Sequence, residues 1–248
     1  MSLIDEVYAA HGGLARWANV RLVTVDLRIG GNILATRFKS PAARELQVAV
    51  DTKRIHARLR PFPRPGQVGV FEADRVRIET DDGRVVSERR VVRGDDGRVI
   101  RRLVWDDLDV LYFFGYALWN YTMTPFLFSW PDFECRESGE WRESDGSVWR
   151  KLAVRSPAGF PTHCRDQVYY FDRQGLLRRL DYTADVFSDA ARGAHLCEAH
   201  RTFDGFVWPT HRVVYVRRAN GSPWRLLTVM EGWITSIAVQ YGDPEPAT

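Results

Sequence analysis

The residues best suited to proton transfer lie in the last third of the chain, around the segment GAHLCEAHRTFDG. Tyr182, Asp185, His195 and His200 fall in neighbouring segments that we expect to form adjacent strands. A histidine with a pKa near neutrality beside a carboxylate is what general acid/base catalysis requires, and a tyrosine hydroxyl can orient a polar group of a substrate. These four residues form the candidate catalytic set.

The same segment raises the question of a metal site. Cys197 and His200 are both zinc-ligand types, but a third ligand from elsewhere in the chain would have to complete the shell. Strand alternation places His195, Cys197 and Ala199 on one face and His200 on the other. We therefore expect no metal site, and expect these side chains to be half-buried and hydrogen-bonded across the sheet.

Other catalytic signatures are missing from the sequence. It contains no Gly-x-Ser-x-Gly elbow, no Gly-x-Gly-x-x-Gly loop and no Walker-type loop, so neither a nucleophilic serine nor a nucleotide cofactor is indicated. Cys135, Cys164 and Cys197 are an odd number without a Cys-x-x-Cys pair, which argues against a disulfide framework and a zinc ribbon. We expect no cofactor.

A long uncharged run, VLYFFGYALWNYTMTPFLFSWP, extends from Val110 to Pro131. A soluble protein can keep such a run by burying it, by contacting a ligand or partner with it, or by inserting it in a membrane. The run contains Asn120, Thr124 and Pro125 and lacks basic flanks, so we predict no transmembrane segment.

The run predicts a helical insertion at about 106–130. Asp106 or Asp107 can cap a helix that ends near Tyr121, before Pro125. Because every face of this helix carries apolar side chains, we expect it to be covered on most sides by the concave face of a curved sheet. Aromatic surfaces of this kind often line sites for lipophilic molecules. The candidate ligand-binding residues are Leu111, Phe114, Leu118, Trp119 and Tyr121.

Strands are predicted along most of the remaining chain. Val23, Val25, Leu27 and Ile29 alternate with polar residues, as in a strand with one buried face, and similar sets follow. The Ser2 segment resembles a capping box that opens a short first helix. Short hairpin turns are predicted at Gly30-Gly31, Asp82-Gly83, Asp96-Gly97, Asp145-Gly146 and Asn220-Gly221.

The composition places limits on the class of protein. The 248 residues suit a single domain, 1–248, with a substantial core. The 35 basic and 32 acidic residues nearly cancel, so we expect no nucleic-acid partner. The first residues, MSLIDEVYAAHGG, lack the basic and apolar regions of a secretory signal, so we expect a cytoplasmic protein. The oligomeric state is left open.

Three local features resemble a known superfamily. They are the opening His11-Gly12-Gly13-Leu14-Ala15-Arg16-Trp17, the strand-turn-strand from Tyr169 to Leu180, and the segment from Asp204 to Thr210 that enters the next strand. With a mid-chain apolar helix in a long meander, the chain resembles the LolA-like lipoprotein-carrier superfamily. It is also similar to uncharacterised bacterial proteins with a His-Gly-Gly-x-x-x-Trp opening. The resemblance implies an incomplete, strongly curved β-barrel whose apolar interior accepts acyl chains or other lipophilic groups.

The expected fold is therefore mainly β: a strongly curved antiparallel sheet or incomplete β-barrel, with an N-terminal helix and a central apolar helix over the concave face. Three classes of function remain. The first is binding of a lipophilic small molecule between sheet and helix, as a carrier or sensor. The second is an enzyme acting on a hydrophobic substrate by cyclisation or isomerisation with acid/base assistance. The third is a module whose aromatic insertion docks on a membrane or protein.

Overall fold

The computed structural model describes residues 2–37, 39, 44–91 and 103–242. Its elements follow the chain in the order α1 (Leu3–Ala10), α2 (Leu14–Trp17), β1 (Val20–Gly30), η1 (Ile33–Arg37), β2 (Arg44–Asp51), β3 (His56–Arg60), β4 (Gln67–Glu72), β5 (Arg75–Thr80), β6 (Val85–Arg90), α3 (Asp107–Met123), η2 (Phe126–Ser129), β7 (Glu134–Arg142), β8 (Val148–Arg155), β9 (Asp166–Phe171), β10 (Leu177–Thr183), β11 (Arg192–Phe203), β12 (Phe206–Arg217) and β13 (Pro223–Tyr241).

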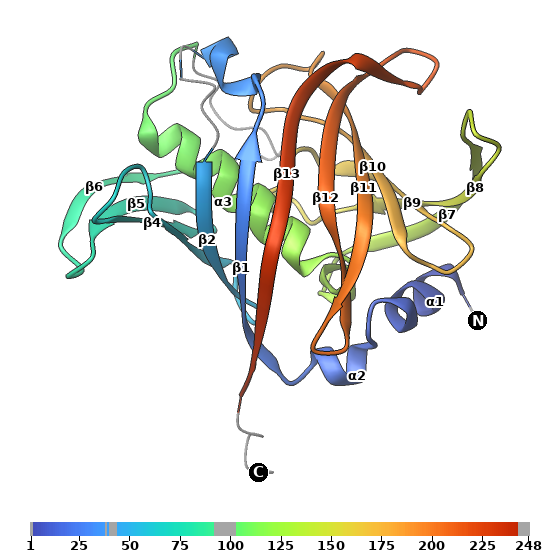
Figure 1. Ribbon diagram of the computed structural model, residues 1–248, viewed down its shortest axis with the longest axis horizontal. Coiled ribbons are helices and arrows are strands. Elements are labelled where there is room, and N and C mark those ends of the chain that lie inside the picture. Colours follow the sequence, from blue (N-terminus) through green and yellow to red (C-terminus); the bar gives the residue numbers. More distant parts are fainter. Residues whose placement is uncertain (1, 38, 40–43, 92–102, 243–248) are drawn as a thin grey trace.

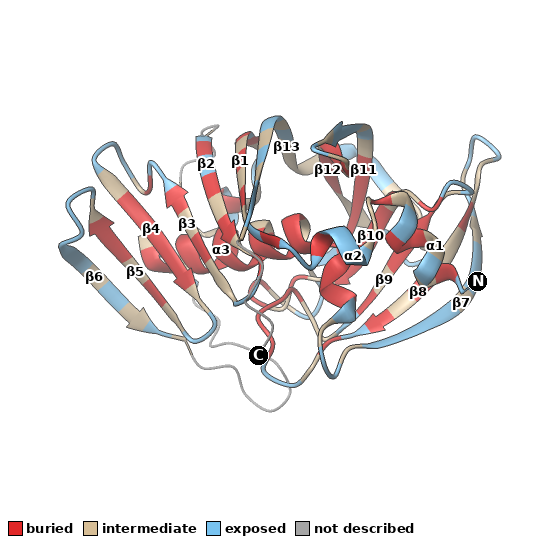
Figure 2. Ribbon diagram, turned by 90° about the horizontal axis from the view of Figure 1, so that it is seen from below, coloured by how far each residue is buried: buried red, intermediate tan, exposed pale blue. Residues whose placement is uncertain are grey.

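All these strands belong to one antiparallel sheet that does not close. Its order is β6-β5-β4-β3-β2-β1-β13-β12-β11-β10-β9-β8-β7, so the first and last strands of the chain pair in its middle and β6 and β7 are its edges. The sheet curves around α3, which lies in its concave face (Figures 1 and 2). The expectation of a curved, mainly β fold with a central helix is confirmed.

The central helix begins and ends for the reasons that its sequence indicates. Asp106 accepts a hydrogen bond from the Asp109 amide, and the Asp109 carboxylate accepts one from the Asp106 amide, which is a complete capping box. The helix continues to Met123, two residues beyond the expected end. Nearly all its side chains are buried, because strands lie around it (Figure 2). Among the residues described, no helix is long and apolar enough to span a membrane.

The concave wall follows the predicted alternation. On β1, Val23, Val25, Leu27 and Ile29 are all buried, whereas Arg28 is exposed. The β1–β2 register sets Val25 opposite Val48 and Leu27 opposite Leu46, which are also buried. One face of these strands therefore forms a continuous apolar surface toward α3.

The turns were predicted with one error. Short turns at Asp82-Gly83, Asp145-Gly146 and Asn220-Gly221 join consecutive strands as expected. The Asp96-Gly97 turn lies outside the described residues. Gly30-Gly31 is not a tight hairpin, because the short helix η1 follows it before β2 begins. Gly31 has φ 116°, and a Cβ there would lie 2.6 Å from the Met230 Cα, so this glycine permits close backbone approach to β13.

The N-terminal segment closes one end of the half-barrel. Ser2 and Asp5 form the predicted capping box of α1, and His11 Nδ1 lies 2.9 Å from the Val7 carbonyl oxygen at its other end. Trp17, in α2, stacks on Phe126 with ring centroids 4.3 Å apart and meets the edge of Phe206 at 5.4 Å. The conspicuous residues of the opening thus pack the core rather than line a site.

Candidate functional site

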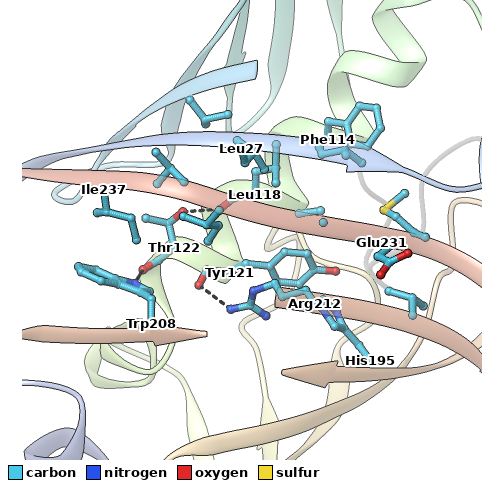
Figure 3. A pocket seen from close by; sticks show the side chains of 18 residues that line it. Leu27, Phe114, Leu118, Tyr121, Thr122, His195, Trp208, Arg212, Glu231 and Ile237 are labelled. Atoms are coloured by element: carbon cyan, nitrogen blue, oxygen red, sulfur yellow. Dashed lines mark hydrogen bonds between the residues drawn. The ribbon is translucent and has the colours of Figure 1, made fainter. Parts of the chain in front are cut away.

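An apolar cavity, here called the inner cavity, lies between α3 and the central strands. Its walls come from β1, β2, β11, β12, β13 and one face of α3, and its volume is about 60 Å³. Leu27 of β1, Ile237 of β13, and Phe114 and Leu118 of the helix line it (Figure 3), as does Val25 of β1. Apolar side chains make up most of the lining, which suits a hydrocarbon group, and His195, Arg212 and Glu231 add polar groups to it.

A second cavity, the side cavity, adjoins the first. Its volume is about 130 Å³, and His163, Tyr182 and Phe187 are among its lining residues. Tyr121, Val214 and Met230 line both cavities. These three side chains therefore form a partition between two parts of one interior space.

The predicted ligand-binding residues divide between two environments. Phe114, Leu118 and Tyr121 line the inner cavity. Leu111 instead packs against β4, where a Cβ on Gly69 would lie 2.5 Å from its Cδ1. The Trp119 indole N–H donates to the Asp51 carbonyl oxygen at 3.1 Å. Leu111 and Trp119 line neither the inner nor the side cavity and hold the helix against the sheet.

A chain of hydrogen-bonded polar groups lies along the wall of the side cavity. The Tyr116 hydroxyl lies 3.0 Å from His163 Nδ1, and the Tyr121 hydroxyl lies 2.6 Å from His163 Nε2. The Tyr182 ring stacks on the imidazole at 3.9 Å between centroids. The Tyr182 hydroxyl is hydrogen-bonded to Tyr121. Burial raises the pKa of both Tyr121 and Tyr182, so both stay protonated hydrogen-bond donors at neutral pH.

His195 occupies the boundary between this chain and the inner cavity. It is 1% exposed, and neither ring nitrogen has a hydrogen-bond partner among the described residues. Its ring meets the face of Tyr121 edge-on, with centroids 4.7 Å apart. Burial, and to a lesser extent the charge of Arg212, hold the pKa of His195 well below its usual value. The imidazole is therefore neutral and offers one donor and one acceptor to whatever enters the cavity.

The candidate catalytic residues are only partly brought together. Tyr182 and His195 lie near each other, with ring centroids 6.3 Å apart. Asp185 and His200 line neither cavity. His200 Nε2 donates to the Leu177 carbonyl oxygen at 2.9 Å, and burial lowers its pKa to about 4.

The strand that carries these histidines departs from simple alternation at one residue. Ala199 has φ 51° and is exposed, so its predicted place on the inner face with His195 and Cys197 is wrong. The local bend also leaves His200 partly buried. Cys197, one of the two residues considered as zinc ligands, instead accepts a hydrogen bond at its Sγ from Arg212 at 3.3 Å. Among the residues described, no group of three or more His, Cys, Asp or Glu residues has a geometry to hold a metal.

Two residues of the site were not among the predicted ones. His163 precedes β9, and only the fold brings it to Tyr121, which is 42 positions away in the chain. Arg212 could have been found, because it shares a strand face with Trp208, Thr210 and Val214, and all four are buried. An arginine in phase with apolar residues on a strand is the signal that marks it.

Comparisons with known proteins identify the fold. No protein-family model matches the chain, and no curated protein matches its sequence. Among solved structures, a DUF1329 family protein from Desulfovibrio piger is similar at 12% identity over 98% of this chain and 94% of that one, with a TM-score of 0.55. The LolA superfamily protein NE2245 from Nitrosomonas europaea is similar at 10% identity over 97% and 93%, with a TM-score of 0.54. The chain therefore has a LolA-like fold.

Proposed function

We propose that the protein binds a lipophilic small molecule between α3 and the concave face of the sheet. The observation that carries this proposal is the pair of adjoining cavities. Apolar side chains make up most of the inner one, which His195 and Arg212 also line, and tyrosines and a histidine line part of the side cavity. This combination of apolar and polar lining suits a ligand with a hydrocarbon body and a polar group. A LolA-like fold, with the open interior that the sequence resemblance implies, supports the same conclusion.

The size of the cavities indicates how binding would proceed. Small-molecule sites commonly enclose roughly 300–1,000 Å³. The inner and side cavities, of about 60 and 130 Å³, are smaller, so the partition has to move before a lipid-sized ligand fits. Met230 lines both cavities and a third small one beside Gly31, and its flexible side chain can repack at low cost. Binding is then coupled to displacement of Met230.

Native mass spectrometry of the purified protein tests the proposal directly. A bound lipophile should add discrete mass, and denaturing extraction followed by small-molecule mass analysis should identify it. Stripped protein should then take up a neutral lipophilic dye such as Nile red, with a rise in fluorescence that the extracted compound reverses. A protein of bare chain mass that binds no dye would refute lipophile binding.

Catalysis in the same cavity is the second candidate. It is favoured by the neutral His195, whose ring nitrogens have no hydrogen-bond partner among the described residues, beside the protonated Tyr182. The imidazole could take a proton, and the tyrosine hydroxyl could hydrogen-bond to a substrate oxygen. The reaction class would be isomerisation or cyclisation of a hydrophobic substrate. Incubating the extracted ligand with protein in D₂O should then introduce deuterium, and His195→Gln should abolish this exchange. A ligand recovered unlabelled from the wild-type protein would exclude this reaction, and ligand binding would remain as the function.

The third class of function, a docking module, depends on an exposed aromatic insertion. The aromatic side chains of the insertion, Tyr112, Phe113, Phe114, Trp119 and Phe126 among them, are buried, so the insertion does not present the exposed docking surface that a docking module needs. The cytoplasmic location stays a prediction.

A further inference from the structure

Arg212 is a buried cation that lines the apolar inner cavity. Its side chain extends from β12, the residue is 9% exposed, and its guanidinium carbon lies 4.9 Å from the centroid of the Tyr121 ring. Figure 3 shows it beside Tyr121 and close to His195. Removing a charge from water is costly unless an opposite charge or strong hydrogen bonds compensate for it.

The hydrogen bonds that Arg212 makes are few and involve neutral acceptors. Nη1 donates to Cys197 Sγ at 3.3 Å, and Nη2 donates to the Tyr121 carbonyl oxygen at 3.4 Å. Nε has no partner. Within the described part of the chain, no carboxylate lies within ion-pair distance of this guanidinium. The nearby Glu231 carboxylate, which also lines the cavity, is 2.8 Å from His211 Nε2 instead.

Arg179 shows how the same protein treats another buried arginine. It is 0% exposed, and its Nε and Nη2 donate to the two oxygens of Asp181 at 2.7 and 3.0 Å. This is the two-point pairing of guanidinium and carboxylate that makes arginine suitable for burial. On Arg212 the corresponding edge, Nε with Nη2, has no such carboxylate among the described residues.

His195 adds a second polar group to the same place. Cys197 lies opposite Arg212 in the β11–β12 register, and His195 is two residues further along the same strand face. Both of its ring nitrogens are buried and have no hydrogen-bond partner in the described part of the chain. A neutral imidazole N–H can donate to an oxygen that the guanidinium already holds.

We propose that the lipophilic ligand is a carboxylic acid in its ionised form, bound through the Nε/Nη2 edge of Arg212 and a hydrogen bond from His195. Its hydrocarbon chain lies along the apolar walls near Leu27 and Ile237. This inference rests on the proposed lipophile binding and specifies the chemical class of the ligand. A carboxylate would supply the negative charge that is missing beside Arg212, which an alcohol or ester cannot do.

The test compares matched ligands on the stripped full-length protein. Isothermal titration calorimetry would measure dodecanoate and dodecanol, which share a chain and differ in the head group. We expect the wild-type protein to bind the acid at least about tenfold more tightly. Arg212→Gln should lower the affinity for the acid to that for the alcohol and leave the alcohol almost unchanged. Arg201→Gln, an exposed arginine on β11, removes the same charge and should change neither affinity.

The outcomes separate the two proposals. Equal wild-type affinities for acid and alcohol would overturn carboxylate recognition while lipophile binding stands, and this comparison needs no variant to fold. An equal loss of affinity for both ligands in a folded Arg212→Gln protein would also overturn carboxylate recognition, because the arginine would then only support the cavity. Failure of the wild-type protein to bind either ligand, with Nile red also excluded, would defeat lipophile binding itself.

Discussion

The Tyr121 hydroxyl lies 2.6 Å from Nε2 of His163, and this contact joins the end of α3 to the segment that leads into β9. Tyr121 also separates the inner cavity from the side cavity. One side chain therefore connects the polar chain of tyrosines and histidine to the apolar binding space. A ligand that passes between the cavities has to open the partition that Tyr121 forms with Val214 and Met230, of which Met230 has the most flexible side chain.

Tyr121→Phe should destabilise the protein. The change leaves a buried imidazole nitrogen without the hydroxyl, and an unsatisfied buried polar group costs about 1–3 kcal/mol. Tyr215→Phe is a suitable control, because the Tyr215 hydroxyl makes no hydrogen bond to a described residue. Urea unfolding followed by tryptophan fluorescence measures both. Equal stability of the two variants would mean that the Tyr121–His163 contact contributes nothing.

Met230→Ala should enlarge the interior at the partition. Because Met230 lines both cavities, its truncation should join them and raise the affinity for Nile red several-fold. It should also lower stability by about 2 kcal/mol, the small end of the range for large-to-small changes, since Met230 is only half-buried. Met230→Leu keeps the volume and should retain wild-type affinity. Unchanged dye binding by the alanine variant would show that Met230 does not restrict entry.

Local pattern was sufficient to predict the scaffold. The alternation of Val25 and Leu27 with polar residues predicted the concave wall, and the aspartates at 106 and 107 predicted the start of α3. Both signals depend on residues that are close in sequence. For this reason the sheet, its central helix and three of the ligand-lining residues were accessible without a structure.

The polar part of the site could not be predicted from local sequence patterns. The contact of His163 with Tyr121 depends on how a loop packs on a helix, and no sequence spacing encodes it. The positive φ of Ala199 is unusual for an alanine, so the irregular backbone that leaves Ala199 exposed has no signature in the residue type. Long-range packing therefore decided which candidate residues meet.

Gly115→Ala should destabilise the contact between α3 and β4. A Cβ at this position would lie 2.5 Å from the Cβ of Phe71, which cannot move without its backbone. Overpacking of this kind costs about 1–3 kcal/mol, although alanine is the better helix former. Gly232→Ala is the control, because its new Cβ would meet only the Arg28 carbonyl oxygen at 3.9 Å. Thermal unfolding should distinguish them, and similar midpoints would contradict tight packing at Gly115.

The Asp106 cap of α3 should stabilise the protein both through its charge and through its hydrogen bond, and two variants measure these contributions separately. Burial alone would raise the pKa of Asp106, but hydrogen bonds from Arg89 and the Asp109 amide outweigh it and lower the pKa to about 2. The charge therefore stabilises the fold above about pH 4, and this contribution is lost as the pH falls toward 2. Because the side chain is 48% exposed, the electrostatic part should be small.

Asp106→Ala removes the cap and should cost about 0.5–2 kcal/mol at neutral pH. Asp106→Asn keeps a capping oxygen and loses only the charge. Its loss in free energy of unfolding should therefore be smaller and should shrink toward zero as the pH falls toward 2. Urea unfolding over a pH series provides both numbers. A deficit of the asparagine variant that is independent of pH would exclude the ion pair with Arg89 as its cause.

Buried histidines should make the fold sensitive to acid. Burial lowers the pKa of His11 and of His200 to about 4, and it also holds the pKa of His195 well below its usual value. The unfolded chain takes up these protons near pH 6.5, whereas the folded chain does not. The free energy of unfolding should therefore fall as the pH drops from about 6.5 to about 4, by at most about 1.4 kcal/mol per pH unit for each histidine.

His200→Gln tests this dependence at a position outside the binding site. The glutamine amide can still donate to the Leu177 carbonyl oxygen but cannot titrate, so the variant should match the wild-type protein at neutral pH more closely than a truncation would. Below about pH 6 its stability should fall less steeply, because one proton fewer is taken up on unfolding. Urea midpoints at several pH values measure the slope. An unchanged slope would mean that His200 is protonated equally easily in the folded and unfolded chains.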